Sequence, residues 1–314
     1  MTGAGERRRE QLVVSGAGRG RRLDLFLSEN LSGVSRKQVK RALDAGRVFV
    51  DGRVVRHAGL RLDGGETVRL TLDSPAPPSP KPELPVLYRD ASLLAVNKPP
   101  GLPVHPSVDG VPNALDLVRE LLESEEPPGT AVPVLLHRLD VDTSGVLLMA
   151  LNAAANRDLA AQFAERRVVK DYLALVAGRP PWQLQIEDQL KPGVRGRTVR
   201  VKSGGRPACT RVRARALGPG FALVEAYPKT GRTHQIRAHL AAEGFPLLGD
   251  TLYGGPARIP LPDGGLLTAH RHLLHASRLA FHHPETARPV VIEAPMPEDF
   301  KPFLAILAVM EEGG

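Results

Sequence analysis

The chain has 314 residues, 42% of them hydrophobic and 24% charged, which is enough for two ordinary domains and excludes wholesale disorder. No apolar run approaches the ~20 residues that cross a bilayer, and no apolar stretch follows the basic start, so we expect neither a membrane span nor a secretory signal. The single cysteine, Cys209, excludes an internal disulfide framework and a multi-cysteine metal site. We therefore expect a cytoplasmic protein.

Positive charge is concentrated near the start of the chain. Residues 1–73 hold 15 basic and 9 acidic residues, a net charge of +6, whereas the rest of the chain carries only +2. A small basic module on a nearly neutral body indicates a polyanionic partner, and nucleic acid is the partner we expect.

Residues 1–19 are predicted to form a flexible basic arm, because no strand precedes the fragment GAGRG and arginines follow it. The segment 20–73 predicts a small α+β module, in which a short helix starts at Leu23, Ser35 caps a second helix and Asp51-Gly52 forms a hairpin turn. The second helix has an outer face of cations without a compensating acid, namely Arg36, Lys37, Lys40 and Arg41. This order of elements resembles the ribosomal-protein S-four-like RNA-binding module, which implies that the four cations bind RNA.

Residues 74–85 contain six prolines in twelve positions and predict a semi-extended linker. Beyond it, residues 86–314 predict an α+β domain with a mixed, mostly antiparallel sheet, because strand-like runs outnumber helical stretches and do not alternate regularly with them. The strands are expected at 86–88, 93–97, 134–140, 146–151, 171–176, 210–217 and 221–227, and the helices at 114–122, 153–165, 233–242 and 300–310.

Three polar segments of this domain are candidates for chemistry. The sequence HRLDVDTSG, from His137 to Gly145, lies between two apolar runs, where a rigid scaffold often holds catalytic groups. In GRTHQIR, residues 231–237, Thr233 is the predicted cap of a helix, and two arginines with a histidine suit anion binding. In KDYLALV, residues 170–176, period-two alternation places Tyr172 on one strand face with Ala174 and Val176.

Together these segments resemble the motifs of the RluA-type family of RNA pseudouridine synthases, over residues 86–300. The resemblance implies a pseudouridine synthase fold and the isomerisation of uridine to pseudouridine in RNA. With an S-four-like module in front, it implies a large-subunit (23S) ribosomal RNA target. The reaction breaks the bond from C1′ to N1 and joins C1′ to C5 with no net change of atoms, so we expect no cofactor and no metal.

The resemblance also implies roles for single residues. Asp140 is the expected catalytic aspartate, and Arg237 forms an ion pair with it. Tyr172 is expected to stack on the target base, with Leu274 on the other side of that base. Further residues are expected beside the substrate, namely His137, Arg138, Arg232 and His234, with Arg138 filling the gap that the flipped nucleotide leaves.

One basic surface is predicted from the residues alone. Arg211, Arg213 and Arg215 alternate with Val212 and Ala214, so they share one strand face, in a stretch that contains no acid. Like charges on one face cost stability unless an anion covers them, so we predict that this face binds the RNA backbone. The histidines at 270, 272 and 275 lack the spacing of a metal site, and we expect them to be structural or to face RNA.

Two alternatives stay open at this point. The same chemistry on transfer RNA is one, and a non-enzymatic RNA-binding or ribosome-assembly protein is the other. A pure binder needs none of Asp140, Tyr172 and Arg237, which favours the enzyme. Nothing in the sequence demands an oligomer, so we expect a monomer. The sequence does not reveal which uridine is modified, or whether Asp140 attacks C1′, attacks the ring or abstracts a proton.

Overall fold

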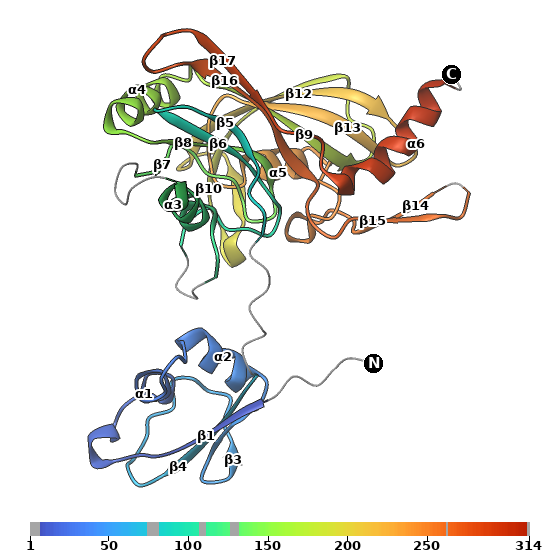
Figure 1. Cartoon of the computed structure of the whole chain (residues 1–314). Helices are drawn as coiled ribbons and strands as arrows, with labels where there is room; N and C mark the ends of the chain where they lie inside the picture. Colours follow the sequence, from blue (N-terminus) through green and yellow to red (C-terminus); the bar gives the residue numbers. More distant parts are fainter. Residues whose placement is uncertain (1–6, 74–81, 107–110, 126–131, 262, 313–314) are drawn as a thin grey trace. The chain divides into compact units, whose positions relative to one another are not determined.

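The computed structural model describes residues 7–73, 82–106, 111–125, 132–261 and 263–312. The chain forms two compact units, and the second begins at Pro82, inside the segment 74–85 that was predicted to be a linker (Figure 1). Residues 74–81 lie outside the described part of the chain.

The N-terminal unit packs two helices against a small antiparallel sheet. In helix α2 the side chain of Ser35 accepts from the backbone N–H of Gln38, while the Gln38 side chain accepts from the backbone N–H of Ser35. Asp51 and Gly52 both have positive φ angles, 48° and 78°, as the tight hairpin turn requires. The sheet order is β1-β4-β2-β3. The elements are β1 (Arg7–Val13), α1 (Leu23–Asn30), α2 (Arg36–Asp44), β2 (Val48–Val50), β3 (Arg53–Val54) and β4 (Thr67–Asp73).

The flexible arm predicted over residues 1–19 is wrong from Arg7 onward. Strand β1 pairs with β4 along its whole length, from Arg7 opposite Asp73 to Val13 opposite Thr67. Val14 follows and is only 1% exposed, within the core of this unit. The sequence did not reveal this strand because its partner is distant in the chain. Residues 1–6 lie outside the described part.

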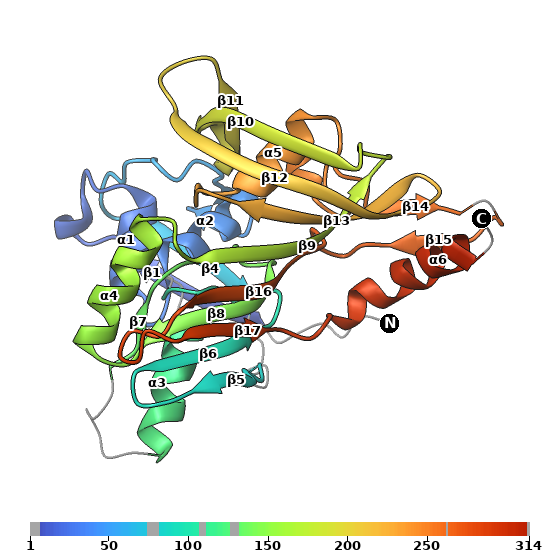
Figure 2. The ribbon, with the colours of Figure 1, turned by 90° about the horizontal axis from the view of Figure 1, so that it is seen from above.

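The second unit is built on one large sheet, in the order β11-β10-β12-β13-β9-β16-β8-β6-β5, with β17 beside β16 and β7 beside β8 (Figure 2). Its described strand pairs are antiparallel except β16 with β8, which run parallel. The predicted mixed, mostly antiparallel α+β fold is confirmed. The strands are β5 (Val86–Arg89), β6 (Leu93–Lys98), β7 (Val134–Leu135), β8 (Ser144–Ala150), β9 (Val169–Ala177), β10 (Gln183–Pro192), β11 (Thr198–Val201), β12 (Arg206–Leu217), β13 (Phe221–Pro228), β16 (Leu274–His282) and β17 (Pro289–Glu293), with a separate hairpin of β14 (Arg258–Pro260) and β15 (Leu266–Thr268).

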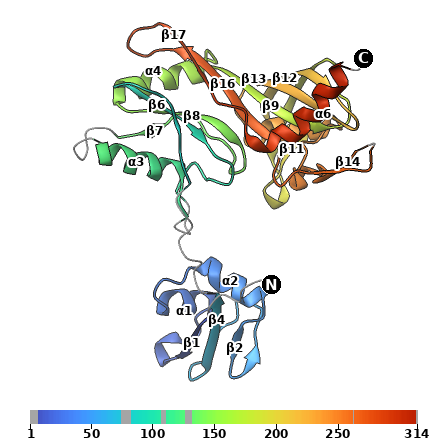
Figure 3. The same ribbon diagram turned by 45° about the vertical axis from the view of Figure 1, so that its right-hand side comes forward.

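Helices cover both faces of this sheet (Figure 3). Alternate residues of β6 and β8 pack against α3 (Ala114–Glu125) on one face and against α4 (Ala153–Ala164) on the other. In the other half of the sheet, α5 (Gln235–Ala242) packs on the face that carries Ala174, and α6 (Lys301–Glu312) packs on the face that carries Leu175.

The strand predicted over 134–140 ends at Leu135, because a side chain interrupts the ladder. Leu135 lies opposite Met149, so residue 136 would come next to Leu148. Instead, the backbone N–H of Leu148 donates to the His137 Nε2 at 3.0 Å. The chain therefore leaves the sheet after β7, and residues 136–143 form a loop that we call the Asp140 loop.

Candidate active site

A cavity of about 280 Å³ opens where the Asp140 loop, β9, the start of β16 and the loop between β13 and α5 meet. The structure brings together, on the walls of this cavity, all the residues that the sequence placed at the catalytic site or beside the substrate: His137, Arg138, Asp140, Tyr172, Arg232, His234, Arg237 and Leu274. We call it the base cavity.

The end of the Asp140 loop is anchored where β8 starts to pair with β16. Thr143 shares a hydrogen bond of 2.9 Å with His272, and Ser144 shares one of 2.9 Å with His275. Gly145 has a φ of 113°, and a Cβ at this position would lie 2.1 Å from the carbonyl oxygen of Ala276. Only glycine allows the two strands to approach this closely, so the TSG of the motif serves to position the loop.

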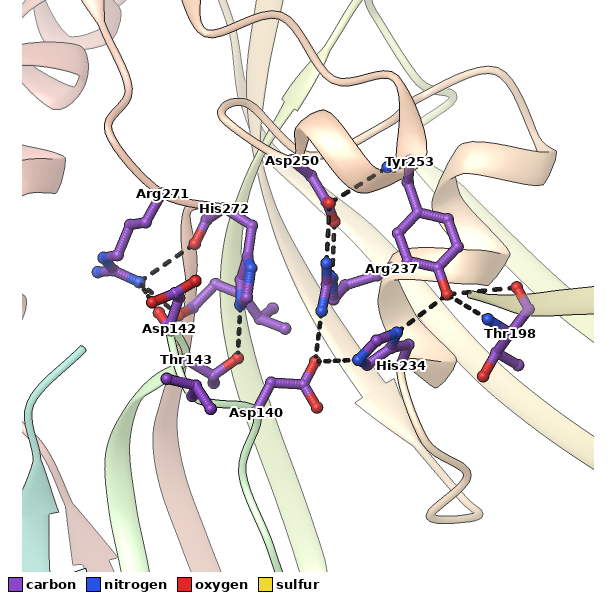
Figure 4. Close-up of polar contacts among 12 residues, drawn as sticks. Asp140, Asp142, Thr143, Thr198, His234, Arg237, Asp250, Tyr253, Arg271 and His272 are labelled. Carbon is purple, nitrogen blue, oxygen red and sulfur yellow. Dashed lines mark hydrogen bonds and ion pairs between the residues drawn. The ribbon is translucent and has the colours of Figure 1, made fainter. Parts of the chain in front are cut away.

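Asp140 belongs to a chain of three charged groups (Figure 4). Its Oδ2 accepts from an Nη of Arg237 at 2.9 Å. The rest of the Arg237 guanidinium binds both carboxylate oxygens of Asp250, with Nε to Oδ2 at 2.7 Å and Nη to Oδ1 at 2.9 Å. Arg237 is 6% exposed and Asp250 is 2% exposed, so this bidentate pair is buried. Burial lowers the pKa of Arg237, but the two carboxylates outweigh it and raise the pKa above its ordinary value, so the guanidinium stays charged.

His234 lies on the other side of the Asp140 carboxylate, with its Nε2 3.8 Å from Oδ2. Its Nδ1 shares a hydrogen bond of 3.1 Å with the Tyr253 hydroxyl. Burial lowers the pKa of His234 despite the attraction of Asp140, so the neutral imidazole is favoured at pH 7. The predicted helix cap at Thr233 is wrong, because His234, with a φ of 53°, is the residue before α5. The left-handed backbone at His234 turns its ring toward both Asp140 and Tyr253.

Tyr172 and Leu274 supply apolar walls to the base cavity. Tyr172 on β9 lies opposite Ala276, and Leu274 on the neighbouring strand lies opposite Ala174, so both side chains are on the same face of the sheet. Burial, with a smaller effect of Asp140, raises the pKa of Tyr172 above its ordinary value, so the phenol stays neutral. The arrangement is suited to holding a flat, uncharged ring next to a carboxylate.

Sequence reasoning missed several groups that hold the site. Asp250 and Tyr253 lie in GDTLYGG, residues 249–255, a segment to which the sequence analysis assigns no role, and the Arg237 guanidinium lies over the Tyr253 ring at 5.1 Å. Lys98 is 0% exposed and donates to the carbonyls of Pro99, Leu102 and Val141 at 2.8–2.9 Å. Burial lowers the pKa of Lys98 to about 7. A lysine next to Pro99, at the end of an apolar strand, is the feature of the sequence that could have indicated a buried role for Lys98.

Arg271 holds the Asp140 loop from the other side. It donates to the carbonyl of Asp142 at 2.8 Å and pairs with Asp299, just before α6. Lys98 and Arg271 therefore bind the carbonyls of the two residues that follow Asp140. Because both side chains are buried, their bonds to these carbonyls fix the backbone that carries the Asp140 carboxylate.

The basic faces predicted to bind RNA are partly paired with acids. On α2, Arg36 pairs with Asp24 at 2.9 Å, so the absence of a compensating acid is wrong for this residue. On β12, Arg213 and Arg215 both pair with Glu225 of the neighbouring strand. Each acid is distant in sequence and near only after folding. Lys40 and Arg41 are exposed, and the side chain of Lys37 lies outside the described part.

The β12 arginines also lie away from the base cavity. Tyr172 is opposite Ala226, and Ala226 is opposite Val212, so these three side chains share one face of the sheet. Arg211 and Arg213 alternate with Val212 and therefore point to the other face, where Arg211 lies over the Tyr227 ring. RNA binding by this face stays a prediction.

In the part of the chain that the structure describes, no three His, Cys, Asp or Glu side chains are grouped to hold a metal ion. Nor does any described helix have both the length and the apolar surface to cross a membrane.

Comparison with known proteins places this geometry in a family. Residues 92–242 match the model of the RNA pseudouridylate synthase family, and residues 21–68 match the S4 domain. The chain is 37% identical to the ribosomal large subunit pseudouridine synthase D of Xanthomonas campestris pv. campestris, over 95% of this chain and 92% of that protein. It is 32% identical to synthase D of Zymomonas mobilis subsp. mobilis (96% and 98%) and 36% identical to synthase C of Haemophilus ducreyi (92% and 92%).

A solved structure, human RNA pseudouridylate synthase domain containing 4, superposes with a TM-score of 0.60 at 25% identity, over 71% of this chain and 93% of that chain. Relatives above 30% identity cover nearly the whole of both chains. The chain therefore belongs to the RNA pseudouridine synthases, which isomerise uridine to pseudouridine in RNA, and it carries an S4 domain in front of the synthase domain.

Proposed function

We propose that this synthase modifies uridines of large-subunit ribosomal RNA. The relatives from Xanthomonas, Zymomonas and Haemophilus are all named as ribosomal large subunit synthases. The basic S4 domain supports a large structured RNA over a small one. We further propose that the enzyme acts as a monomer in the cytoplasm.

The observation that carries the catalytic proposal is the Asp140 carboxylate, held by Arg237 on the wall of the base cavity. Moving C1′ from N1 to C5 needs an ionised carboxylate, as a nucleophile or as a base for the C5 proton. The guanidinium of Arg237 is the counter-ion of this carboxylate, and Asp250 keeps that guanidinium in place. We propose Asp140 as the catalytic residue and Arg237 as the group that orients it.

The target base has to leave its stack in order to reach Asp140. We propose that Tyr172 stacks on the uracil and that Leu274 packs against its other side. Arg138 is exposed at the rim of the cavity, which is the place for a side chain that fills the gap in the RNA. His137, Arg232 and His234 complete the walls.

Two surfaces outside the base cavity are proposed to bind RNA. One is the face of α2 with Arg36, Lys37, Lys40 and Arg41. The other is the β12 face with Arg211, Arg213 and Arg215, which would take up RNA distant from the target base because it lies on the opposite side of the sheet. Replacing the cations of either face by glutamine should weaken RNA binding and reduce its salt dependence, and an unchanged salt slope would exclude that face.

Tritium release tests the target. Transcripts of large-subunit ribosomal RNA and of transfer RNA, both carrying uridine tritiated at C5, are incubated with the wild-type enzyme. Bond formation at C5 expels the label, so the assay reads the reaction itself. Release from the ribosomal transcript alone supports the proposal, and release from transfer RNA alone contradicts it and favours the alternative target.

A further inference from the structure

A second cavity, of about 240 Å³, adjoins the base cavity. It lies between the end of α4, the start of β9 and the loop that follows β13. Five residues line both cavities, so the two share a wall: Phe163, Lys170, Thr230, Gly231 and Arg232. The others that line the second cavity alone are Ala164, Arg166, Val168 and Lys229.

The second cavity is strongly basic. Four of its nine lining residues are cations, namely Arg166, Lys170, Lys229 and Arg232, and none is an acid. Within the described residues, none of the four forms an ion pair with a carboxylate. The polar contacts of two of them are with backbone carbonyls, from Lys170 Nζ to Thr230 at 3.5 Å and from Arg232 Nε to Pro207 at 3.1 Å.

Some arginines elsewhere in the same unit do have carboxylate partners. Arg213 pairs with Glu225, Arg200 pairs with Asp188, and Arg278 pairs with Asp171. Around the second cavity, like charges gather without such partners, and Lys170 is buried enough that its pKa falls below its ordinary value. Grouped cations repel one another, and an anion placed among them removes that cost.

The end of a helix accounts for only part of the cluster. Arg166 follows the last turn of α4, where carbonyl groups favour a positive charge. Lys170 comes from β9, and Lys229 and Arg232 come from the loop after β13. These three cations converge on the same cavity from other elements, so the helix end does not explain them.

We propose that the second cavity binds a backbone phosphate of the RNA, beside the nucleotide whose base enters the base cavity. A phosphodiester supplies the missing negative charge, and the shared wall with the base cavity places it next to the flipped nucleotide. Such a contact fixes the register of the strand and carries no sequence information. The assignment rests on the proposed function, because that function puts the uridine in the base cavity.

The test uses Arg166→Gln/Lys229→Gln, since both side chains are exposed and neither lines the base cavity. Arg179→Gln/Lys202→Gln removes the same charge from exposed positions elsewhere and is the matched control. Large-subunit ribosomal RNA transcripts are ethylated sparsely at their phosphates, and bound RNA is separated from free RNA. The positions at which ethylation prevents binding are mapped, and pseudouridine is mapped on untreated RNA in parallel.

We expect the wild type and the control to lose binding when a phosphate beside the modified uridine is ethylated. The double variant should bind native RNA about tenfold more weakly, with a salt slope lower by about 0.7 to 1, and should no longer sense ethylation at that phosphate. If the double variant shows the same ethylation interference as the wild type, the proposal is overturned. It is also overturned if the interference that the double variant loses is at a phosphate far from the modified uridine. Failure of the wild type to form pseudouridine refutes the proposed function instead, and the parallel mapping distinguishes the two.

Discussion

Asp250→Asn is the substitution that most directly tests whether Asp250 keeps Arg237 in position beside Asp140. The carboxylate binds Arg237 through two hydrogen bonds, of 2.7 and 2.9 Å, in a buried position. Asparagine keeps the shape but offers one acceptor oxygen, and its amide places an N–H donor against the guanidinium. The Arg237 charge would then have Asp140 as its single carboxylate partner.

The expected effects follow from these contacts. Breaking one side of a buried ion pair costs about 3 kcal/mol, and for a domain of this size the melting temperature falls by about 6–12 °C. A guanidinium that shifts by on the order of an ångström also misplaces the Asp140 carboxylate. Such a displacement lowers kcat by roughly 100-fold while binding of RNA changes little.

Thermal unfolding and single-turnover tritium release measure the two effects. The control is Asp188→Asn, which removes an aspartate from a partly exposed ion pair with Arg200, at 2.6 Å, outside the cavity. It should cost less than about 1 kcal/mol and leave kcat unchanged. Wild-type kcat in Asp250→Asn would refute the argument that Asp250 positions Arg237.

Three further predictions concern the frame of the site. Gly145→Ala should destabilise the synthase domain by more than about 3 kcal/mol in urea unfolding, because its Cβ would lie 2.1 Å from a carbonyl oxygen, whereas Gly101→Ala, with open space around it, should cost about 1–2 kcal/mol. Lys98→Met should cost about 3 kcal/mol or more, since it removes the donor from one buried and two partly buried carbonyls, and wild-type stability would contradict this. Burial lowers the pKa of His272 to about 4, so the unfolded state takes up a proton first, and the contribution of His272 to the free energy of unfolding should fall between pH 6.5 and 4 by up to about 1.4 kcal/mol per pH unit. In urea unfolding at each pH, His272→Gln should reduce the measured slope by this contribution, while buried His239 and His275 keep theirs, and the exposed His282→Gln should leave the slope unchanged.

Local patterns predicted the local structure well. Ser35 and Asp51-Gly52 act through neighbouring backbone groups, so their sequence context was sufficient. The strand at Arg7–Val13 was missed because it depends on β4, and the pairing of Arg213 was missed because Glu225 comes from the next strand. Such contacts follow from the sheet order, which no short segment encodes.

The candidate site was predicted through its motifs rather than through its geometry. Asp140 and Arg237 were expected to meet, and the structure places them 2.9 Å apart. Asp250, which completes the chain, lay in a segment without an assigned role. The carbonyl contacts of Lys98 and Arg271 form only where the end of β6 and the segment before β16 meet the Asp140 loop. These segments are distant in the sequence, so no residue spacing predicts the contacts.

Comparing Asp140→Asn with Asp142→Asn tests the central claim most directly. Both changes remove one negative charge from the same loop, two residues apart, but only Asp140 lines the base cavity. On ribosomal RNA labelled at C5 of uridine, the account predicts no tritium release by Asp140→Asn and release within about threefold of wild type by Asp142→Asn, with both variants still binding the RNA. Substantial release by Asp140→Asn would contradict the assignment of its carboxylate to the reaction.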